Sequence, residues 1–226
     1  MRLSILLATA MVLFAGTAHA LSLDALTSKD VSGGLKEALA QGAGKAVATL
    51  GRADGFLGNP KVRIALPESL RQIESMMRTF GLGKHADELV TTMNRAAEAA
   101  VPEARTLLVN SVKQMSVEDA KGILTGGDDA ATQYFRRTTS GPLTEKFRPI
   151  VRKAIEKVKL AEKYDQFAGK AAKFGLIKEE DAQLDNYVTQ KALDGLYLMI
   201  AEEEKAIRAD PAGAAGKLAR KVFGAL

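Results

Sequence analysis

The sequence predicts an all-α protein, a single-domain multi-helix bundle with one short β-ribbon near residues 56–66. Three observations support this fold class. Apolar residues recur at helical spacing through most of the chain, which is the pattern of helices with one buried face. Alanine and glycine are abundant, whereas tryptophan is absent and aromatic residues make up only 5%, which favours helices packed at close range. A chain of 226 residues can also bury about 70% of its unfolded surface.

The first twenty residues predict a cleavable secretory signal peptide. Arg2 supplies a positive charge, residues 3–16 form a short apolar run, and Ala18-His19-Ala20 matches a small-residue cleavage site. The run is shorter than the roughly 20 apolar residues of a membrane span, so an uncleaved anchor is the weaker interpretation. We therefore expect cleavage after Ala20, a soluble protein in the periplasm, and one helical domain over 21–226.

Composition disfavours several classes of site. The chain has no cysteine, which excludes disulfides, thiolate zinc sites, a cysteine nucleophile and a lipid-attached cysteine. Its net charge of +5 is only mildly basic, which argues against nucleic acid as a partner. Beyond the leader the single histidine is His85, and no phosphate-binding or calcium-binding motif is complete. We expect no metal and no cofactor.

The segment after the leader predicts one helix followed by the β-ribbon. Apolar residues at helical spacing mark a helix at 28–50. In the next stretch, turn residues surround an alternation of Val62, Ile64 and Leu66. Alternation with period 2 is typical of a half-buried strand, so this stretch is where we expect the ribbon.

The middle of the chain predicts a run of shorter helices. Pro67 occupies a first helical position and begins a helix that ends at Gly81. Another helix follows at 85–100, and Pro102 begins the next. Ser116 then opens a capping box, a serine whose side chain caps the first turn of a helix, and this short helix ends at Gly126.

The last third predicts longer helices with opposite charges. We expect helices at 129–139, at 143–158 with a kink or break at Pro149, at 160–174 and at 181–209, followed by a last basic helix after Pro211. Basic residues predominate in 145–178 and acidic residues in 179–210. One interpretation is a basic patch for an anionic partner. The favoured one is an antiparallel pair of helices whose charges neutralise each other.

Five segments resemble one known family. They are DGFLGNPKVRIALP (54–67), MNRAAEAAVPEA (93–104), SVEDAKGILTGGDDAATQYFRRTT (116–139), LTEKFRPIV (143–151) and YVTQKALDGLYLMIAEEEKAIRADP (187–211). Together they are similar to the bacterial family catalogued as domain of unknown function 4197, over nearly all of the mature chain. The resemblance implies a bacterial envelope protein with a helical fold. It implies no activity, substrate or catalytic residue.

The helix at 181–209 holds the candidate catalytic group. Residues 192–201 are apolar apart from Asp194 and one tyrosine, and a helix that is apolar on all sides is buried. Asp194 therefore needs a partner, and Tyr187 and Lys191 lie on the same side of the helix. Such a group could perform acid/base chemistry. A structural ion pair between Lys191 and Asp194 is the favoured alternative.

Two further polar groups are candidate binding sites. Asn94, Arg95 and Glu98 interrupt an alanine-rich helical face, and Glu204 and Arg208 are spaced for a pair one turn apart. For both groups a structural salt bridge is favoured over a ligand site.

The sequence as a whole favours an exported, soluble helical binding or interaction module of the bacterial envelope, whose partner is a lipid or another envelope component. The alternative is a periplasmic enzyme that uses the Tyr187, Lys191 and Asp194 group, although no motif supports catalysis. The basic helix at 214–226 either lies on an anionic membrane surface or, as we favour, docks on the bundle.

Overall fold

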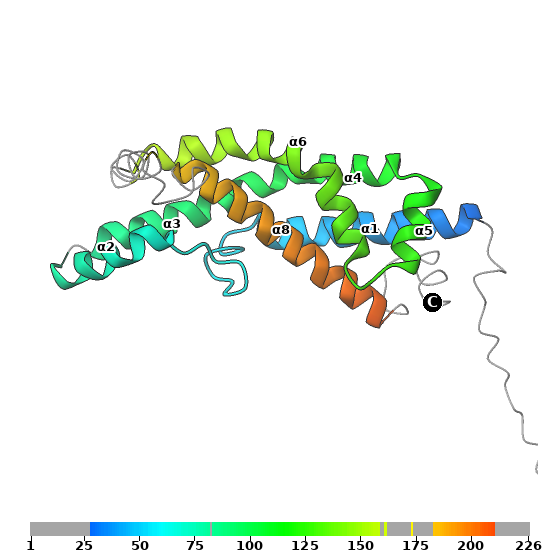
Figure 1. The fold of residues 1–226 in the computed structure, drawn as a ribbon, viewed down its shortest axis with the longest axis horizontal. Coiled ribbons are helices and arrows are strands. Elements are labelled where there is room, and N and C mark those ends of the chain that lie inside the picture. The colour runs from blue at the N-terminus through cyan, green and yellow to red at the C-terminus, as the bar shows by residue number, and fades with distance from the viewer. Residues whose placement is uncertain (1–27, 82, 159–160, 162–172, 174–182, 211–226) are drawn as a thin grey trace, which may run out of the picture.

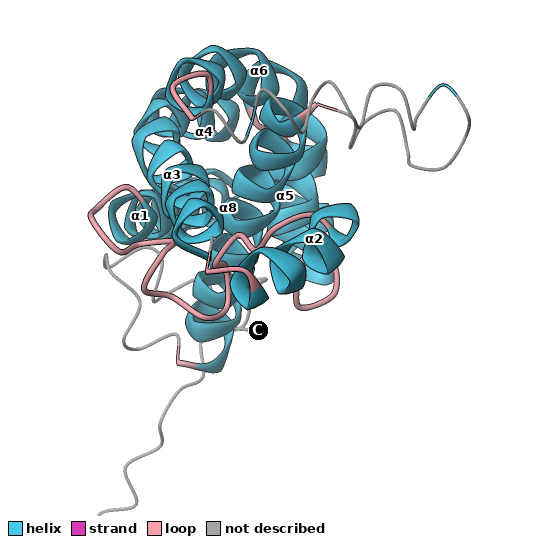
Figure 2. Ribbon diagram, turned by 90° about the vertical axis from the view of Figure 1, so that its left-hand side faces the viewer, coloured by secondary structure: helices cyan, strands magenta, loops and turns pink. Residues whose placement is uncertain are grey.

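The computed structural model describes residues 28–158 except 82, residues 161 and 173, and residues 183–210. This part of the chain is helical and contains no strand, which confirms the all-α fold class (Figures 1 and 2). The elements are α1 (Ser28–Leu50), α2 (Glu68–Thr79), α3 (Gly83–Ala100), the 3₁₀ turn η2 (Val101–Glu103), α4 (Ala104–Gln114), α5 (Val117–Thr125), α6 (Ala130–Ile155) and α8 (Leu184–Ala209). The predicted leader, most of the predicted helix 160–174 and the basic helix at 214–226 lie outside the described residues.

Helix α8 lies at the centre of the bundle and packs against α1, α3 and α6 (Figure 2). Its residues Val188, Ala192 and Leu196 are completely buried. Helix α6 runs antiparallel to it, because Asp185 at the start of α8 contacts the end of α6 and Glu204 near the end of α8 contacts the start of α6. The two helices therefore lie side by side along most of their length.

Helix α6 passes through two prolines as one helix from Ala130 to Ile155. The predicted separation into helices at 129–139 and 143–158 is wrong, and of the predicted kink or break at Pro149 the break does not occur. Pro142 and Pro149 both lie on the exposed side, while Leu143 and Phe147 are completely buried. A proline inside a helix costs about 3 kcal/mol, and burial of several large apolar side chains at about 1.5–3 kcal/mol each offsets this cost. The helix changes direction along its length in Figure 1, and prolines inside a helix are a common cause of such a bend.

The β-ribbon predicted near residues 56–66 is wrong, because no strand forms among the described residues. The alternation of apolar and polar residues nevertheless matches the burial of the segment. Val62, Ile64 and Leu66 are buried, and the residues between them are exposed. The hydrogen-bonding partner of this extended segment is a side chain. Asn94 on α3 accepts a bond from Ile64 N and donates one to Ile64 O, both at 2.8 Å. The amide of Asn94 thus takes the place of a neighbouring strand.

The segment between α1 and α2, residues 51–67, packs closely against α8 at Gly195. A Cβ atom at this position would lie 2.7 Å from Cε1 of Phe56 and 3.2 Å from Cβ of Val62. Phe56 is completely buried, so its ring has no room to move away. Glycine is required here because the backbone of α8 and the Phe56 ring are in direct contact.

We expect Gly195→Ala to lower the free energy of unfolding by about 1–3 kcal/mol, the usual cost of an overpacked core. Urea denaturation followed by circular dichroism measures it. Gly44→Ala is the matched control, because a Cβ atom at Gly44 would meet nothing within 4 Å, and this change should be neutral or stabilising. Equal effects of the two changes would contradict the close contact at Gly195.

Helices α2 and α3 form a hairpin at one end of the molecule (Figure 1). Gly81 between them has a φ of 75°, a conformation that glycine adopts readily. Arg78 near the end of α2 donates hydrogen bonds to Glu74 and to Asp87 on α3, and so ties the two helices together. The neighbouring Phe80 is 74% exposed, the highest value among the large apolar side chains of the described residues.

The Arg78–Asp87 contact predicts a loss of stability in acid. The hydrogen bond from Arg78 lowers the pKa of Asp87 below its ordinary value of 3.8. Because the pKa is lower in the folded state, the contact stabilises the hairpin at pH values above 3.8 and is lost as the pH falls through the lowered value. An NMR titration of the Asp87 carboxyl should give a pKa below 3.8 that returns to the ordinary value in Arg78→Ala. A titration unchanged by Arg78→Ala would refute the contact.

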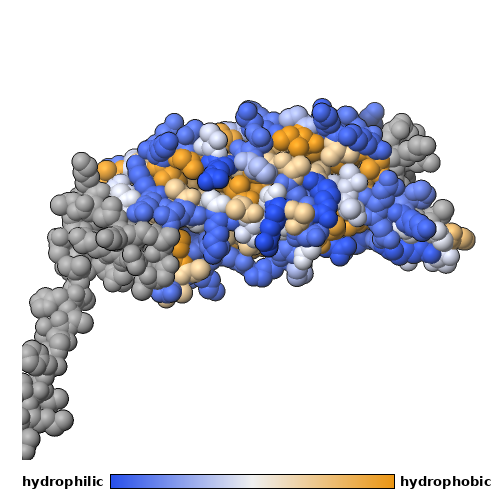
Figure 3. Space-filling view, turned by 180° about the vertical axis from the view of Figure 1, so that it is seen from behind, coloured by the Kyte–Doolittle hydropathy of each residue, from blue (hydrophilic) through white to orange (hydrophobic). Residues whose placement is uncertain are grey.

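The rest of the surface carries both polar and apolar residues. Apolar residues show between polar ones on the side opposite to that of Figure 1 (Figure 3). Besides Phe80, the large apolar side chains exposed within the described residues are Val117 and Leu198. In the same part of the chain, no helix is long and apolar enough to cross a bilayer.

Candidate functional site

The predicted catalytic group does not converge in the structure. Asp194 is half-buried, and its Oδ1 lies 3.5 Å from Nη1 of Arg136 and 3.2 Å from Nε2 of Gln190. Tyr187 donates its hydroxyl to the carbonyl of Ala65 at 3.0 Å, and the ammonium of Lys191 lies 5.7 Å from the Tyr187 ring centre. Asp194 therefore pairs with Arg136 on α6, whereas Lys191 contacts the tyrosine ring.

The group of Asn94, Arg95 and Glu98 fixes the segment 51–67 onto α3. Glu98 is only 5% exposed, and its Oε1 accepts hydrogen bonds from the backbone N–H groups of Phe56 and Leu57, each at 3.0 Å. Its other oxygen accepts a bond from Nη1 of Arg95 at 2.6 Å. Arg95 also donates to Asp54 at 2.8 Å, and the bond to Glu98 is the main cause that raises the pKa of Arg95. All three side chains are engaged by the protein itself.

The pair of Glu204 and Arg208 caps the start of α6. Glu204 is 5% exposed and accepts bonds from Ala131 N at 3.0 Å, from Thr132 N at 2.9 Å and from the Thr132 hydroxyl at 2.9 Å. Arg208 donates to Glu204 at 2.8 Å and to the carbonyl of Ile123 at 2.9 Å. The first N–H groups of a helix have no partner within the helix, and here a carboxylate from a distant helix supplies it.

A third group, which the sequence analysis did not select, lies at the other end of the α6–α8 contact. Asp185 is 8% exposed, and its Oδ2 accepts hydrogen bonds from Nε of Arg148 at 3.2 Å and from Nε of Arg152 at 2.8 Å. Nη2 of Arg152 lies 2.7 Å from the same oxygen as an ion pair. Arg148 also donates to Oε1 of Gln183 at 3.1 Å. The bond to Asp185 is the main cause that raises the pKa of Arg152. Two arginines thus share one carboxylate.

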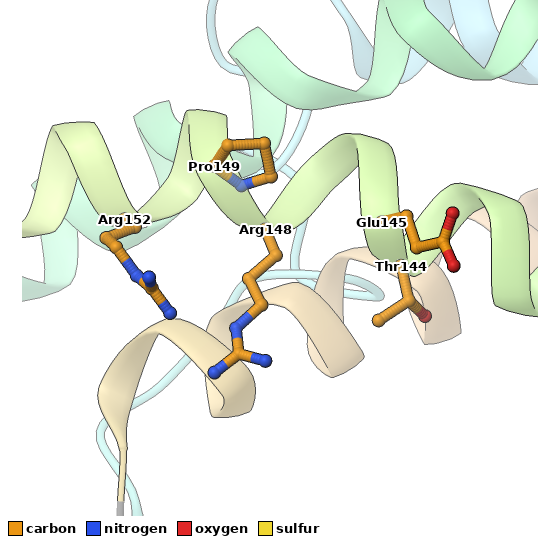
Figure 4. A pocket seen from close by; sticks show the side chains of 5 residues that line it. All are labelled: Thr144, Glu145, Arg148, Pro149 and Arg152. Atoms are coloured by element: carbon orange, nitrogen blue, oxygen red, sulfur yellow. The ribbon is translucent and has the colours of Figure 1, made fainter.

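These two arginines border an open pocket of about 350 Å³ on α6, lined by Thr144, Glu145, Arg148, Pro149 and Arg152 (Figure 4). Arg148 and Arg152 extend from α6 toward the beginning of α8, and Thr144 and Glu145 lie at the other end of the row. The side chains of Arg148 and Arg152 remain 39% and 49% exposed. The pocket therefore presents positively charged hydrogen-bond donors to solvent.

The spacing of Arg148 and Arg152 in the sequence could have indicated part of this group. Residues four apart lie on the same side of a helix, so Arg148 and Arg152 could have been selected as a pair. Asp185 could not, because it follows more than thirty residues later and meets them only through the antiparallel packing of α6 and α8. The basic and acidic segments do meet at this point. Other acidic residues of α8 pair elsewhere, Glu202 with Lys61 and Glu203 with Lys45.

Thr189 lies four residues beyond Asp185 on α8, and its hydroxyl is buried with no hydrogen-bond partner among the described residues. Such a group costs about 1–3 kcal/mol. We therefore expect Thr189→Val, which keeps the shape and removes the hydroxyl, to raise the free energy of unfolding by about 1 kcal/mol. Thermal unfolding checks this. A lower melting temperature would show that the hydroxyl has a partner in solution.

Metal ligands do not gather in the described part of the chain, where no group of three or more histidine and acidic side chains is placed to hold an ion. His85, the single histidine beyond the predicted leader, is exposed, with its Nδ1 3.9 Å from Glu88. The described residues thus give a metal ion no such set of ligands.

Comparisons with known proteins identify the family. Neither the curated proteins nor the solved structures gave a match. A family model described as "Protein of unknown function (DUF4197)" matches residues 25–224, in agreement with the resemblance carried by the five sequence segments. Because the match covers nearly the whole chain, this protein belongs to the DUF4197 family.

Proposed function

We propose that the protein is an exported, non-enzymatic binding module of the bacterial envelope that holds an anionic group in the pocket on α6. The leader in residues 1–20 supports export to the periplasm, and the family match begins at residue 25, just after the expected cleavage site. The envelope is thus the compartment in which the ligand of this pocket would be found.

The observation that carries the proposal is the sharing of Asp185 by Arg148 and Arg152. Two positive charges face the one negative charge of Asp185, so this carboxylate does not neutralise both guanidinium groups. Each guanidinium has five N–H donors, and in the described part of the chain Nη1 of both arginines has no acceptor. Asp185 and Gln183 hold the two side chains in place, which reduces the entropy lost when a ligand binds.

The chemistry of this arrangement selects an oxyanion. A guanidinium presents paired N–H groups that match the two oxygens of a phosphate or carboxylate, whereas an ammonium does not. Lys146, Lys153 and Lys157 lie exposed on and just beyond α6, so this end of the helix is rich in positive charge. A phosphate group is the ligand that uses both the geometry and the charge best.

Isothermal titration with inorganic phosphate at constant ionic strength tests the proposal. We expect binding to the wild type, and about tenfold weaker binding to Arg148→Lys and Arg152→Lys, which keep a positive charge beside Asp185 but lose the paired donors. Arg137→Lys is the matched control, because Arg137 also lies on α6 and pairs with an acidic residue, Asp119, away from the pocket. No binding to the wild type, or an equal loss in the control, would overturn the proposal.

The proposed export of the protein to the periplasm is tested separately. We expect the protein in the periplasmic fraction with an N-terminus that begins at Leu21. An intact N-terminus in the cytoplasmic fraction would contradict export. Both results are read by N-terminal sequencing of the fractionated protein.

A further inference from the structure

The pocket on α6 has a negative end as well as a positive one. Glu145 lines it together with Arg148, three residues further along the helix, and residues at this spacing lie about 5–6 Å apart at their Cβ atoms. Glu145 is exposed and has no ion-pair partner among the described residues. Figure 4 shows Thr144 and Glu145 at one end of the row and Arg152 at the other, with Arg148 between them. A simple anion would be attracted by one end of this pocket and repelled by the other.

The end at Glu145 offers several hydrogen-bond acceptors. Thr144 donates its hydroxyl to the carbonyl of Ser140 at 2.8 Å, so the oxygen of this hydroxyl can only accept from a ligand. Pro149 has no N–H group and cannot donate to the carbonyl of Glu145, as the residue four positions later in a helix normally does. A carboxylate, a hydroxyl oxygen and a backbone carbonyl without its helical donor therefore belong to the same turn of α6. These are the partners that a primary ammonium group, with its three N–H donors, requires.

We infer that the ligand is a zwitterion of the phosphoethanolamine class, with its phosphate at Arg148 and Arg152 and its ammonium at Thr144 and Glu145. This inference rests on the proposed phosphate site and specifies its ligand. Pro149 also lines the pocket, and its ring provides an apolar surface for the two methylene groups that join phosphate to ammonium. The soluble headgroup and the corresponding phospholipid share this chemistry.

The inference is tested by comparing three soluble probes on the wild type. We expect O-phosphoethanolamine to bind about tenfold more tightly than ethyl phosphate, which lacks the ammonium. We expect O-phosphocholine to bind no more tightly than ethyl phosphate, because its quaternary nitrogen has no N–H to donate. Equal affinities for O-phosphoethanolamine and ethyl phosphate would overturn the inference and leave the phosphate site standing. No binding of any probe would remove both.

A pair of variants assigns the ammonium site. Glu145→Gln should abolish the preference for O-phosphoethanolamine and leave the binding of ethyl phosphate unchanged or slightly tighter. Glu118→Gln is the matched control, since Glu118 is an exposed carboxylate on α5 outside the pocket and its loss changes the net charge equally. A preference that survives Glu145→Gln, or that disappears in both variants, would overturn the inference.

Vesicles distinguish the two sources of the ligand. Flotation with vesicles of phosphatidylethanolamine and phosphatidylglycerol, compared with phosphatidylglycerol alone, reports a membrane ligand if the protein floats only with the first and Glu145→Gln abolishes this. If the protein binds the soluble probe and floats with neither, the ligand is the free headgroup. Flotation with phosphatidylglycerol alone that equals flotation with the mixture would contradict recognition of the ammonium.

Discussion

Replacement of Glu204 with alanine is expected to lower the free energy of unfolding by about 3–5 kcal/mol, the cost of removing one partner from a buried ion pair. The change leaves the N–H groups of Ala131 and Thr132 without an acceptor. It also leaves Arg208, whose side chain is only 15% exposed, without its carboxylate. Chemical denaturation at neutral pH, followed by the helical signal in circular dichroism, measures the loss.

Glu202 provides the control for this change. It lies two residues away on the same helix and pairs with Lys61, but both side chains are well exposed. Surface pairs of this kind contribute about 0–1 kcal/mol, so Glu202→Ala should change stability little. If Glu204→Ala were as mild as Glu202→Ala, the cap on α6 would not exist in solution.

The second large effect is expected at Glu98. Glu98→Ala removes the acceptor for the buried N–H of Phe56 and for the N–H of Leu57, and each unpaired buried donor costs about 1–3 kcal/mol. We expect a total loss of about 3 kcal/mol in the free energy of unfolding. Because the bonds hold the segment 51–67 on α3, amide hydrogen exchange at Phe56 and Leu57 should accelerate much more than exchange within α8.

Asp54→Asn tests whether the effect belongs to the buried carboxylate. Asp54 is the exposed member of the same network, where its carboxylate pairs with Arg95, and asparagine tolerates its φ of 62°. We expect a change in stability below about 1 kcal/mol and unchanged exchange at Phe56. An equally large effect of both changes would assign the stability to Arg95 rather than to Glu98.

Most of the helices could be predicted from local sequence. The capping box is an example, because the Ser116 side chain accepts a bond from Asp119 N at 3.0 Å and the helix begins at the next residue. The prediction failed where a local rule was overridden by distant packing. Pro149 would end an isolated helix, yet α6 continues because Phe147 and Val151 are buried completely against other helices.

The prediction of a β-ribbon failed for a related reason. Alternation in Val62, Ile64 and Leu66 correctly indicates which side of the segment is buried, but it cannot indicate what bonds its backbone. The bonding partner is the side chain of Asn94, thirty residues away in sequence. The sequence did single out Asn94 and Glu98 as a polar interruption of an apolar face, and their role follows only when the position of the segment 51–67 is known.

The pocket on α6 was missed because its key contact joins two helices. The charges of 145–178 and 179–210 indicated that these segments attract each other, and Arg148, Arg152 and Asp185 satisfy that expectation in part. Lys45 and Lys61, which belong to neither segment, form ion pairs with other acidic residues of α8. Total charge along a segment therefore predicts attraction, but which arginine keeps free donors depends on the three-dimensional arrangement.

The central position of α8 has a consequence for how the chain folds. This helix is the last in the described sequence, and it contacts α1, the first, through a bond between Lys45 and Glu203 that spans 158 positions. Proteins dominated by such distant contacts fold more slowly than bundles whose helices contact their sequence neighbours. Without α8 the start of α6 lacks its cap and the buried faces of α1 and α6 lack their cover. The earlier helices also pack on one another, α3 on α6 and α1 on α4, but the core that they form is covered completely only after residue 208 has been synthesised.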